Sequence, residues 1–125
     1  MKTVQIALLV GGAFLIQNCS PAKPKTSLSD LQGLYGAQGC REFSITGSRI
    51  IAKDVRTSFV IKRIKGQDYL VLDRGVAVDE SICRLVPFHV AEMIPVTKTE
   101  GRETLDILGS SRRTSVIFSK VQLST

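Results

Sequence analysis

Tryptophan is absent from this 125-residue sequence, and histidine occurs once, at position 89. With only five phenylalanines and two tyrosines, the chain has to fill its core mainly with valine, isoleucine and leucine. A single histidine excludes a histidine-rich metal site, and it leaves only His89 for a Ser/His/Asp or Cys/His mechanism. Apolar residues surround His89, and no catalytic motif accompanies it. We therefore expect a structural or partly exposed histidine on a strand.

Other motifs that carry chemistry are also missing. The cysteines lack CxxC spacing, so zinc binding and thioredoxin-type redox work have no support. Gly33, Gly36 and Gly39 match neither a dinucleotide-binding motif nor a P-loop. The only adjacent carboxylates, Asp79 and Glu80, fit no calcium-loop spacing and are typical of a solvated loop. The sequence thus predicts no cofactor and no enzymatic activity.

Long hydrophobic segments are lacking too, with one partial exception at the start of the chain. Residues 6–16 form an uninterrupted stretch of 11 apolar or glycine residues, and Lys2 precedes it. As a helix this stretch would span about 16 Å, roughly half of a hydrocarbon core. It is too short for a transmembrane helix and typical of the hydrophobic part of a secretory signal peptide. We therefore predict a signal peptide over residues 1–18.

The residues that follow resemble a known processing site. Leu15-Ile16-Gln17-Asn18-Cys19 resembles the lipobox of bacterial lipoproteins, with Asn18 where glycine, alanine or serine is usual. The resemblance implies cleavage before Cys19 and lipid on that cysteine, followed by a flexible, lipid-anchored tether over residues 19–29. The alternative is ordinary cleavage after Ala22, which would release a soluble periplasmic or secreted protein.

Cysteine arithmetic predicts one disulfide. Three cysteines are an awkward number in an oxidising compartment, but both processing routes remove Cys19 from the count, one by acylation and one by cleavage. Cys40 and Cys83 then remain as a pair. Their disulfide would close a loop of roughly 44 residues and stabilise the domain by about 4 kcal/mol in the chain-entropy model.

Apolar residues after position 31 recur with a period of two, which is typical of strands. Three dipeptides fit two-residue hairpin loops: Gly47-Ser48, Lys65-Gly66 and Glu100-Gly101. Each loop predicts a register that aligns apolar pairs on one face and opposite charges across the strands. The predicted partners are Ile45 with Ile50, Phe43 with Ala52 and Glu42 with Lys53; Ile61 with Leu70, Phe59 with Leu72 and Arg63 with Asp68; Ile94 with Ile107, Val96 with Leu105 and Lys98 with Glu103.

Further strands are predicted at residues 32–36, 84–90 and 114–123, with the last paired to residues 102–108 and a helical turn at residues 79–83. The sequence therefore predicts an all-β fold, a small antiparallel meander of about eight strands that forms a barrel or a sandwich over residues 30–125. Gly33-Leu34-Tyr35 also resembles the G-x-W opening of lipocalin-type barrels. That resemblance implies a carrier of a small apolar ligand as one possible function.

The net charge of +6 favours anionic partners without naming one. Lys62 and Lys65 flank one hairpin, and Arg112 and Arg113 lie on another loop. If the two tips share one end of the domain, these four residues form a patch for a protein or polyanion partner. Nucleic acid is not expected, because an exported protein does not meet it and stacking aromatics are lacking.

Val60 and Val71 are apolar on the strand face opposite the predicted core. This reversal indicates either a sheet buried on both sides or an exposed contact patch. The function predicted from all these features is that of an exported, lipid-anchored protein of the bacterial outer membrane or cell surface, with a binding or structural role. The alternative function is that of a lipocalin-like carrier. The sequence does not indicate the oligomeric state of the protein.

Overall fold

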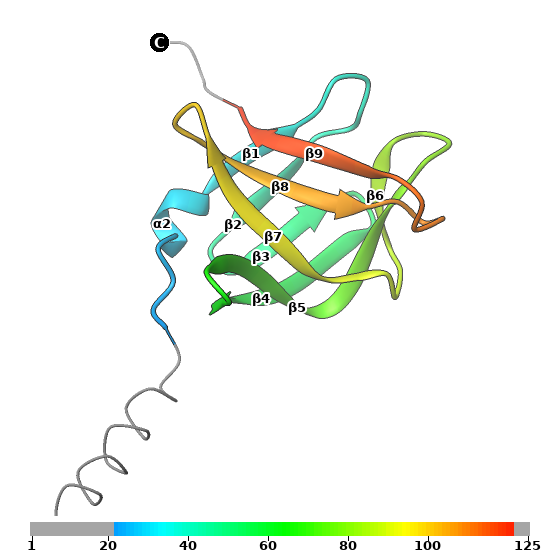
Figure 1. Cartoon of the computed structure of the whole chain (residues 1–125). Helices are drawn as coiled ribbons and strands as arrows, with labels where there is room; N and C mark the ends of the chain where they lie inside the picture. The colour runs from blue at the N-terminus through cyan, green and yellow to red at the C-terminus, as the bar shows by residue number, and fades with distance from the viewer. Residues whose placement is uncertain (1–21, 122–125) are drawn as a thin grey trace, which may run out of the picture.

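The computed structural model describes residues 22–121 (Figure 1). These residues form nine strands and one short helix, and none of their helices is long and apolar enough to cross a membrane. The elements are α2 (Leu28–Leu31), β1 (Gly33–Gly36), β2 (Phe43–Thr46), β3 (Arg49–Ala52), β4 (Val55–Ile64), β5 (Gln67–Asp79), β6 (Arg84–Pro87), β7 (Ala91–Thr99), β8 (Arg102–Leu108) and β9 (Ser115–Lys120).

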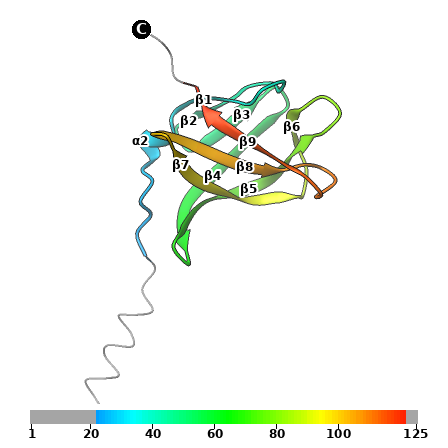
Figure 2. The same ribbon diagram turned by 45° about the horizontal axis from the view of Figure 1, so that its top comes forward.

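Eight of the strands close into an antiparallel barrel. The hydrogen-bonded order runs β4-β3-β2-β1-β9-β8-β7-β5, and the pairing of β4 with β5 closes the ring. Strand β6 lies outside the ring and pairs only with the second half of β5. The all-β prediction is confirmed, and closure decides the choice between barrel and sandwich in favour of the barrel (Figure 2).

The three predicted hairpins form in the predicted registers. Lys65, Gly66, Glu100 and Gly101 all have positive φ angles, as the tight turns that suit the twist of paired strands require. The β4–β5 hairpin matches in every predicted pair, including Arg63 opposite Asp68. In the other two hairpins, three predicted pairs lie beyond the ends of the ladders, which run only from Ser44 with Ile51 to Thr46 with Arg49 and from Val96 with Leu105 to Thr99 with Arg102.

The strands predicted over residues 32–36, 84–90 and 114–123 span Gly33–Gly36, Arg84–Pro87 and Ser115–Lys120 in the structure. The strand predicted over residues 84–90 ends at Pro87, because proline has no N–H group to continue a ladder. His89 therefore lies on the exposed connection between β6 and β7 rather than on a strand, which corrects the prediction for this residue. The helical turn predicted over residues 79–83 is present, with the Cys83 amide donating to the Asp79 carbonyl at 2.7 Å.

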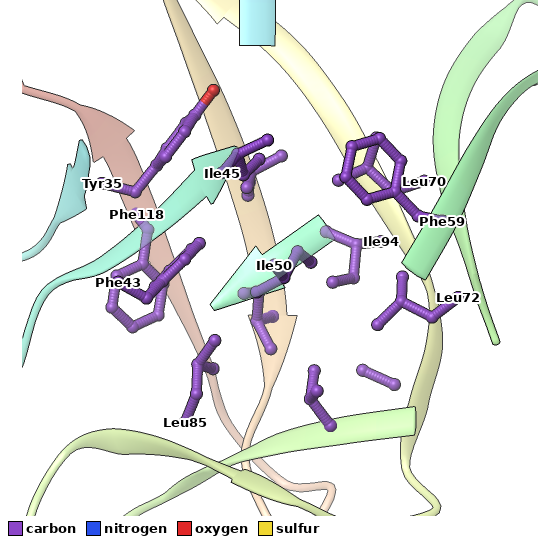
Figure 3. Close-up of a cluster of buried hydrophobic side chains, with 14 of the residues drawn as sticks. Tyr35, Phe43, Ile45, Ile50, Phe59, Leu70, Leu72, Leu85, Ile94 and Phe118 are labelled. Carbon is purple, nitrogen blue, oxygen red and sulfur yellow. The ribbon is translucent and has the colours of Figure 1, made fainter. Parts of the chain in front are cut away.

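Buried hydrophobic side chains from the strands form one cluster in the barrel interior (Figure 3). Tyr35 stacks on Phe43 with ring centroids 5.5 Å apart, and Phe118 meets Phe43 edge-on at 5.0 Å. Leu31 from α2 and Leu85 from β6 join the same buried cluster. Eight-stranded barrels have an interior about wide enough for side chains alone, so this sequence of mainly aliphatic residues can close the core.

The strand registers divide the barrel into two ends. The helix end carries α2 and the β2–β3, β4–β5 and β7–β8 turns; the disulfide end carries the β1–β2, β3–β4, β5–β6, β6–β7 and β8–β9 connections (Figure 1). The predicted disulfide between Cys40 and Cys83 is confirmed at the second end. It joins the β1–β2 loop to the β5–β6 turn, beside a hydrogen bond of 2.8 Å from the Arg41 amide to the Cys83 carbonyl.

The start of the described chain is docked on the barrel. A capping box between Ser27 and Asp30 begins α2, and the Tyr35 hydroxyl donates to the Leu31 carbonyl at 2.7 Å. Residues 25–29, which belong to the predicted tether, are thus in contact with the domain or in the helix. Cys19, the signal peptide and the first part of the tether lie outside the described residues.

Candidate interaction surfaces

The two predicted basic groups lie at opposite ends of the barrel. Lys62 and Lys65 belong to the β4–β5 hairpin at the helix end, while Arg112 and Arg113 lie on the β8–β9 loop at the disulfide end. Strand β8 runs from the helix end to the disulfide end, so the β4–β5 turn and the β8–β9 loop lie a barrel height apart. The single patch of four cations that the sequence allowed does not form.

The two arginines of the β8–β9 loop differ in their surroundings. Arg112 has a φ of 65°, and its guanidinium donates to the His89 carbonyl at 3.2 Å. It therefore ties the β8–β9 loop to the β6–β7 connection. Arg113 is exposed, and its backbone amide donates to the Ser111 hydroxyl at 3.1 Å. Of these two arginines, only Arg113 has a guanidinium that forms no hydrogen bond or ion pair within residues 22–121.

Glu80 holds the β8–β9 loop from the neighbouring turn. Its carboxylate accepts from the Ser111 amide at 3.0 Å, from the Ser111 hydroxyl at 2.7 Å and from the Thr114 hydroxyl. These hydrogen bonds, those of Thr114 and Ser111 first, hold the pKa of Glu80 below its ordinary value of 4.5. A Cβ atom on Gly109 would lie 2.7 Å from the Glu80 carboxylate, so glycine allows this approach.

At the helix end, the carboxylate of Asp68 holds the start of the described chain. Its carboxylate accepts from the backbone amides of Lys25 at 2.9 Å and Thr26 at 2.7 Å, and from the Arg63 guanidinium at 2.8 Å. We call residues 22–27 the strap, because these bonds fasten it across the barrel mouth. Burial favours a raised pKa for Asp68, but the hydrogen bonds from Thr26 and Arg63 outweigh it and lower the pKa below 3.8.

Exposed apolar side chains gather on the outer face of three adjacent strands. Val60 on β4 lies opposite Val71 on β5, which lies opposite Met93 on β7; Val60 is 55% exposed and Met93 44%. The next outward row consists of Lys62, Tyr69 and Pro95. We call these six residues the outer stripe. Val60, Lys62 and Met93 are exposed, and the other three residues are half-buried, so the reversed pattern of Val60 and Val71 marks a surface patch rather than a second buried face.

The sequence pattern alone placed the four members of this stripe on β4 and β5, but not the two on β7. Val60 and Val71 stood out because they alternate with core residues of a predicted hairpin. Met93 and Pro95 also alternate with the core residues Ile94 and Val96, but only the pairing of β5 with β7 places them beside Val71 and Tyr69. No sequence pattern indicated that Glu80 binds the β8–β9 loop, since Glu80 and Ser111 are 31 positions apart.

Two hollows lie on the outer surface of the barrel. One of about 420 Å³ is lined by outward residues of β7, β8 and β9, including Thr97, Asp106 and Ile117. Another of about 500 Å³ lies at the disulfide end between Asp73, Phe88 and His89. The core residues Leu70, Ile94, Leu105, Ile107 and Phe118, by contrast, are 0% exposed. This packing does not support the open internal cavity that an apolar-ligand carrier needs.

Fold and surface together define a class: a small, closed antiparallel β-barrel with one disulfide, a packed interior and an apolar outer stripe. Within residues 22–121, no three histidine, cysteine or acidic side chains gather into a group that could hold a metal ion. In comparisons with known proteins, no family model, no curated protein and no solved structure matches this chain.

Proposed function

We propose that this chain is an exported protein, anchored by lipid on Cys19, that binds a protein partner of the bacterial envelope through the outer stripe. The observation that carries the proposal is the row of apolar side chains across three strands, with Val60 and Met93 exposed and Val71 half-buried between them. Cross-strand neighbours lie about 5 Å apart, so the row forms one continuous surface rather than scattered apolar residues.

The proposed cellular location rests on the sequence, and one structural feature supports it. A short apolar leader followed by a lipobox-like segment fits an exported lipoprotein of the outer membrane or cell surface. The Cys40–Cys83 disulfide is typical of an oxidising compartment. A soluble periplasmic or secreted protein, cut after Ala22, is the alternative. Intact-mass analysis of the mature protein tests both: a lipid adduct on Cys19 is expected, and an unmodified N-terminus at Lys23 contradicts the anchor.

The charges around the stripe indicate the chemistry of the partner. Lys62 lies within the stripe, and Arg49 pairs with Ser58, next to Val60 on the same outer face. Both cations are exposed and form no ion pair within residues 22–121. The partner we expect therefore presents apolar side chains flanked by carboxylates. Aliphatic groups would supply the affinity, and the charges would select the orientation.

Site-specific photo-cross-linking in intact cells tests this binding surface. A photoreactive side chain at Val71 should give one discrete protein adduct. Val60→Glu or Met93→Glu should each reduce that adduct at least tenfold, because an unpaired charge at the centre of an interface costs more than about 1.4 kcal/mol. The matched control is Ile117→Glu, which alters a residue that is 59% exposed on β9, outside the stripe.

Ile117→Glu should leave the adduct intact, and thermal unfolding of the purified variants should show that all three fold. If the stripe variants leave the adduct unchanged, or if Ile117→Glu removes it equally, the stripe is not the binding surface. Arg113→Glu tests the remaining basic tip in the same assay: a loss confined to Arg113→Glu would move the partner to the disulfide end.

A further inference from the structure

The two ends of the barrel differ in charge. The ranges that form the helix end (22–35, 44–50, 58–71, 93–105 and 118–121) contain nine lysines and arginines against four carboxylates. The ranges of the disulfide end (36–43, 51–57, 72–92 and 106–117) contain seven of each. The whole net positive charge of the described chain thus lies at the end where the strap enters.

Much of this charge is free to act on a partner. Two of the four carboxylates, Asp68 and Glu103, are buried and already paired with Arg63 and Lys98. Lys23, Lys25 and Lys65 are exposed, and they form no ion pair within residues 22–121. Backbone contacts with Asp68 hold Lys25 at the barrel mouth, and Lys65 tips the β4–β5 hairpin of the same end.

The strap also limits how far this end can move from an anchor at Cys19. Ala22 lies three positions after Cys19 and Lys25 six positions after it, and the Lys25 amide is bonded to Asp68. A fully extended chain covers at most about 3.6 Å per residue, so the Lys25 backbone lies within about 22 Å of a lipidated Cys19. The length of the tether therefore keeps the helix end near the bilayer.

We propose that the helix end docks on the anionic phospholipid headgroups of the membrane that holds Cys19, with Lys23, Lys25 and Lys65 as the contact residues. This inference rests on the lipid anchor of the proposed function and adds an orientation to it. Electrostatic attraction acts over about one Debye length, roughly 10 Å, and the anchor supplies that proximity. The docked barrel directs the disulfide end away from the bilayer and leaves the outer stripe on its flank, open to a partner.

Lysine acylation of the reconstituted mature protein tests the orientation with its own side chains as probes. The lipidated protein is placed in vesicles of phosphatidylcholine alone or with phosphatidylglycerol, treated briefly with an amine-reactive ester and mapped by mass spectrometry. Lys25 and Lys65 should react about fivefold more slowly in the anionic vesicles, and high salt should abolish the difference. Lys53 is the internal control, because it is exposed at the disulfide end.

Two variants sharpen this test. Asp68→Asn weakens the strap, so Lys65 should lose most of its protection while Lys23, next to the anchor, keeps its own. Combined replacement of Lys23, Lys25 and Lys65 by glutamate should make the two vesicle types equivalent for Lys98, another helix-end lysine. Glutamate at Lys53 and Arg113 is the matched control and should leave the protection of Lys25 unchanged.

Equal reactivity of Lys65 and Lys53 in both vesicle types, on a protein that carries the lipid, would overturn the orientation and leave the anchor standing. Absence of the lipid from the intact mass, together with failure to remain on vesicles, would instead remove the anchor itself. Protection of Lys53 rather than Lys65 would show the opposite end against the membrane and would also refute the proposal.

Discussion

The two ends of the barrel are closed by different kinds of interaction. At the disulfide end, a covalent bond joins Cys40 to Cys83, and Glu80 fastens the β8–β9 loop. At the helix end, Leu31 fills the barrel mouth, and hydrogen bonds to Asp68 hold the strap. The disulfide does not depend on the charge of any side chain, whereas the bonds that hold the strap depend on one ionised carboxylate.

The two closures therefore differ in how they depend on side-chain charge. A disulfide acts chiefly by restricting the unfolded chain, so its effect on stability does not depend on the charge of any side chain. The bonds of Asp68 have their full strength only while the carboxylate is ionised and the strap is in place. The end nearest the chain terminus is therefore the one that can be loosened without unfolding the barrel, and three experiments test that contrast.

The largest effect is expected from the covalent bond. Replacing both Cys40 and Cys83 by alanine should lower the free energy of unfolding by about 4 kcal/mol, because the unfolded chain regains the freedom of a loop of roughly 44 residues. For a domain of this size, that loss lowers the melting temperature by about 20 °C, measured by circular dichroism. Reductant should destabilise the parent protein by a similar amount and leave the variant unchanged. A loss of free energy of unfolding below about 1 kcal/mol would mean that the disulfide does not hold its end more strongly than Asp68 holds the strap.

The Asp68 latch should have a smaller effect that depends on pH. Asp68→Asn should cost about 2 kcal/mol at pH 7 in urea unfolding, since charged hydrogen bonds from Arg63 and the strap weaken. The folded pKa of Asp68 lies below its ordinary value of 3.8, so this stabilisation is complete above about pH 4 and is lost as the pH falls through the folded pKa.

The difference between parent and variant should therefore shrink at pH 3. Asp73→Asn provides the control, because Asp73 is an exposed carboxylate of the same strand that forms no ion pair within residues 22–121. A pH-independent loss in Asp68→Asn would show that shape rather than charge holds the strap.

The smallest effect on global stability is expected at Glu80. Glu80→Gln weakens the bonds to Ser111 and Thr114, so amide hydrogen exchange should speed up across residues 110–114 and remain unchanged in the core strands. The same loop should loosen in the parent protein only once the pH falls below the ordinary glutamate value of 4.5. Glu42→Gln, which changes an exposed carboxylate at the same end, should not affect the loop. Unchanged exchange in Glu80→Gln would leave Arg112 as the residue that holds it.

Much of the fold could be predicted from local sequence. The turn residues of the three hairpins and the period-two alternation fix their registers, because a slip of one residue would place Phe59 and Leu72 in solvent. The disulfide was predictable for another reason: once Cys19 is assigned to the leader, Cys40 has only Cys83 as a partner.

The candidate surfaces were less predictable, because they combine segments that are distant in the sequence. Lys65 and Arg112 look equivalent as basic loop residues, yet strand direction sends them to opposite ends. The strap reads as a polar linker, and only the position of Asp68 at the barrel mouth turns residues 25 and 26 into part of the domain.

The sequence by itself determined the strands, the hairpin registers and the cysteine pair, since these follow from side-chain alternation, turn conformation and a count of thiols. It also predicts the leader and the lipid on Cys19. Three features arise only in the folded barrel: the meander closes into a packed ring, Val60, Val71 and Met93 form one apolar row on the outer face, and the net positive charge lies at the strap end. Those features depend on which strands become neighbours, and hydrogen bonding across the closed ring, rather than local propensity, sets that arrangement.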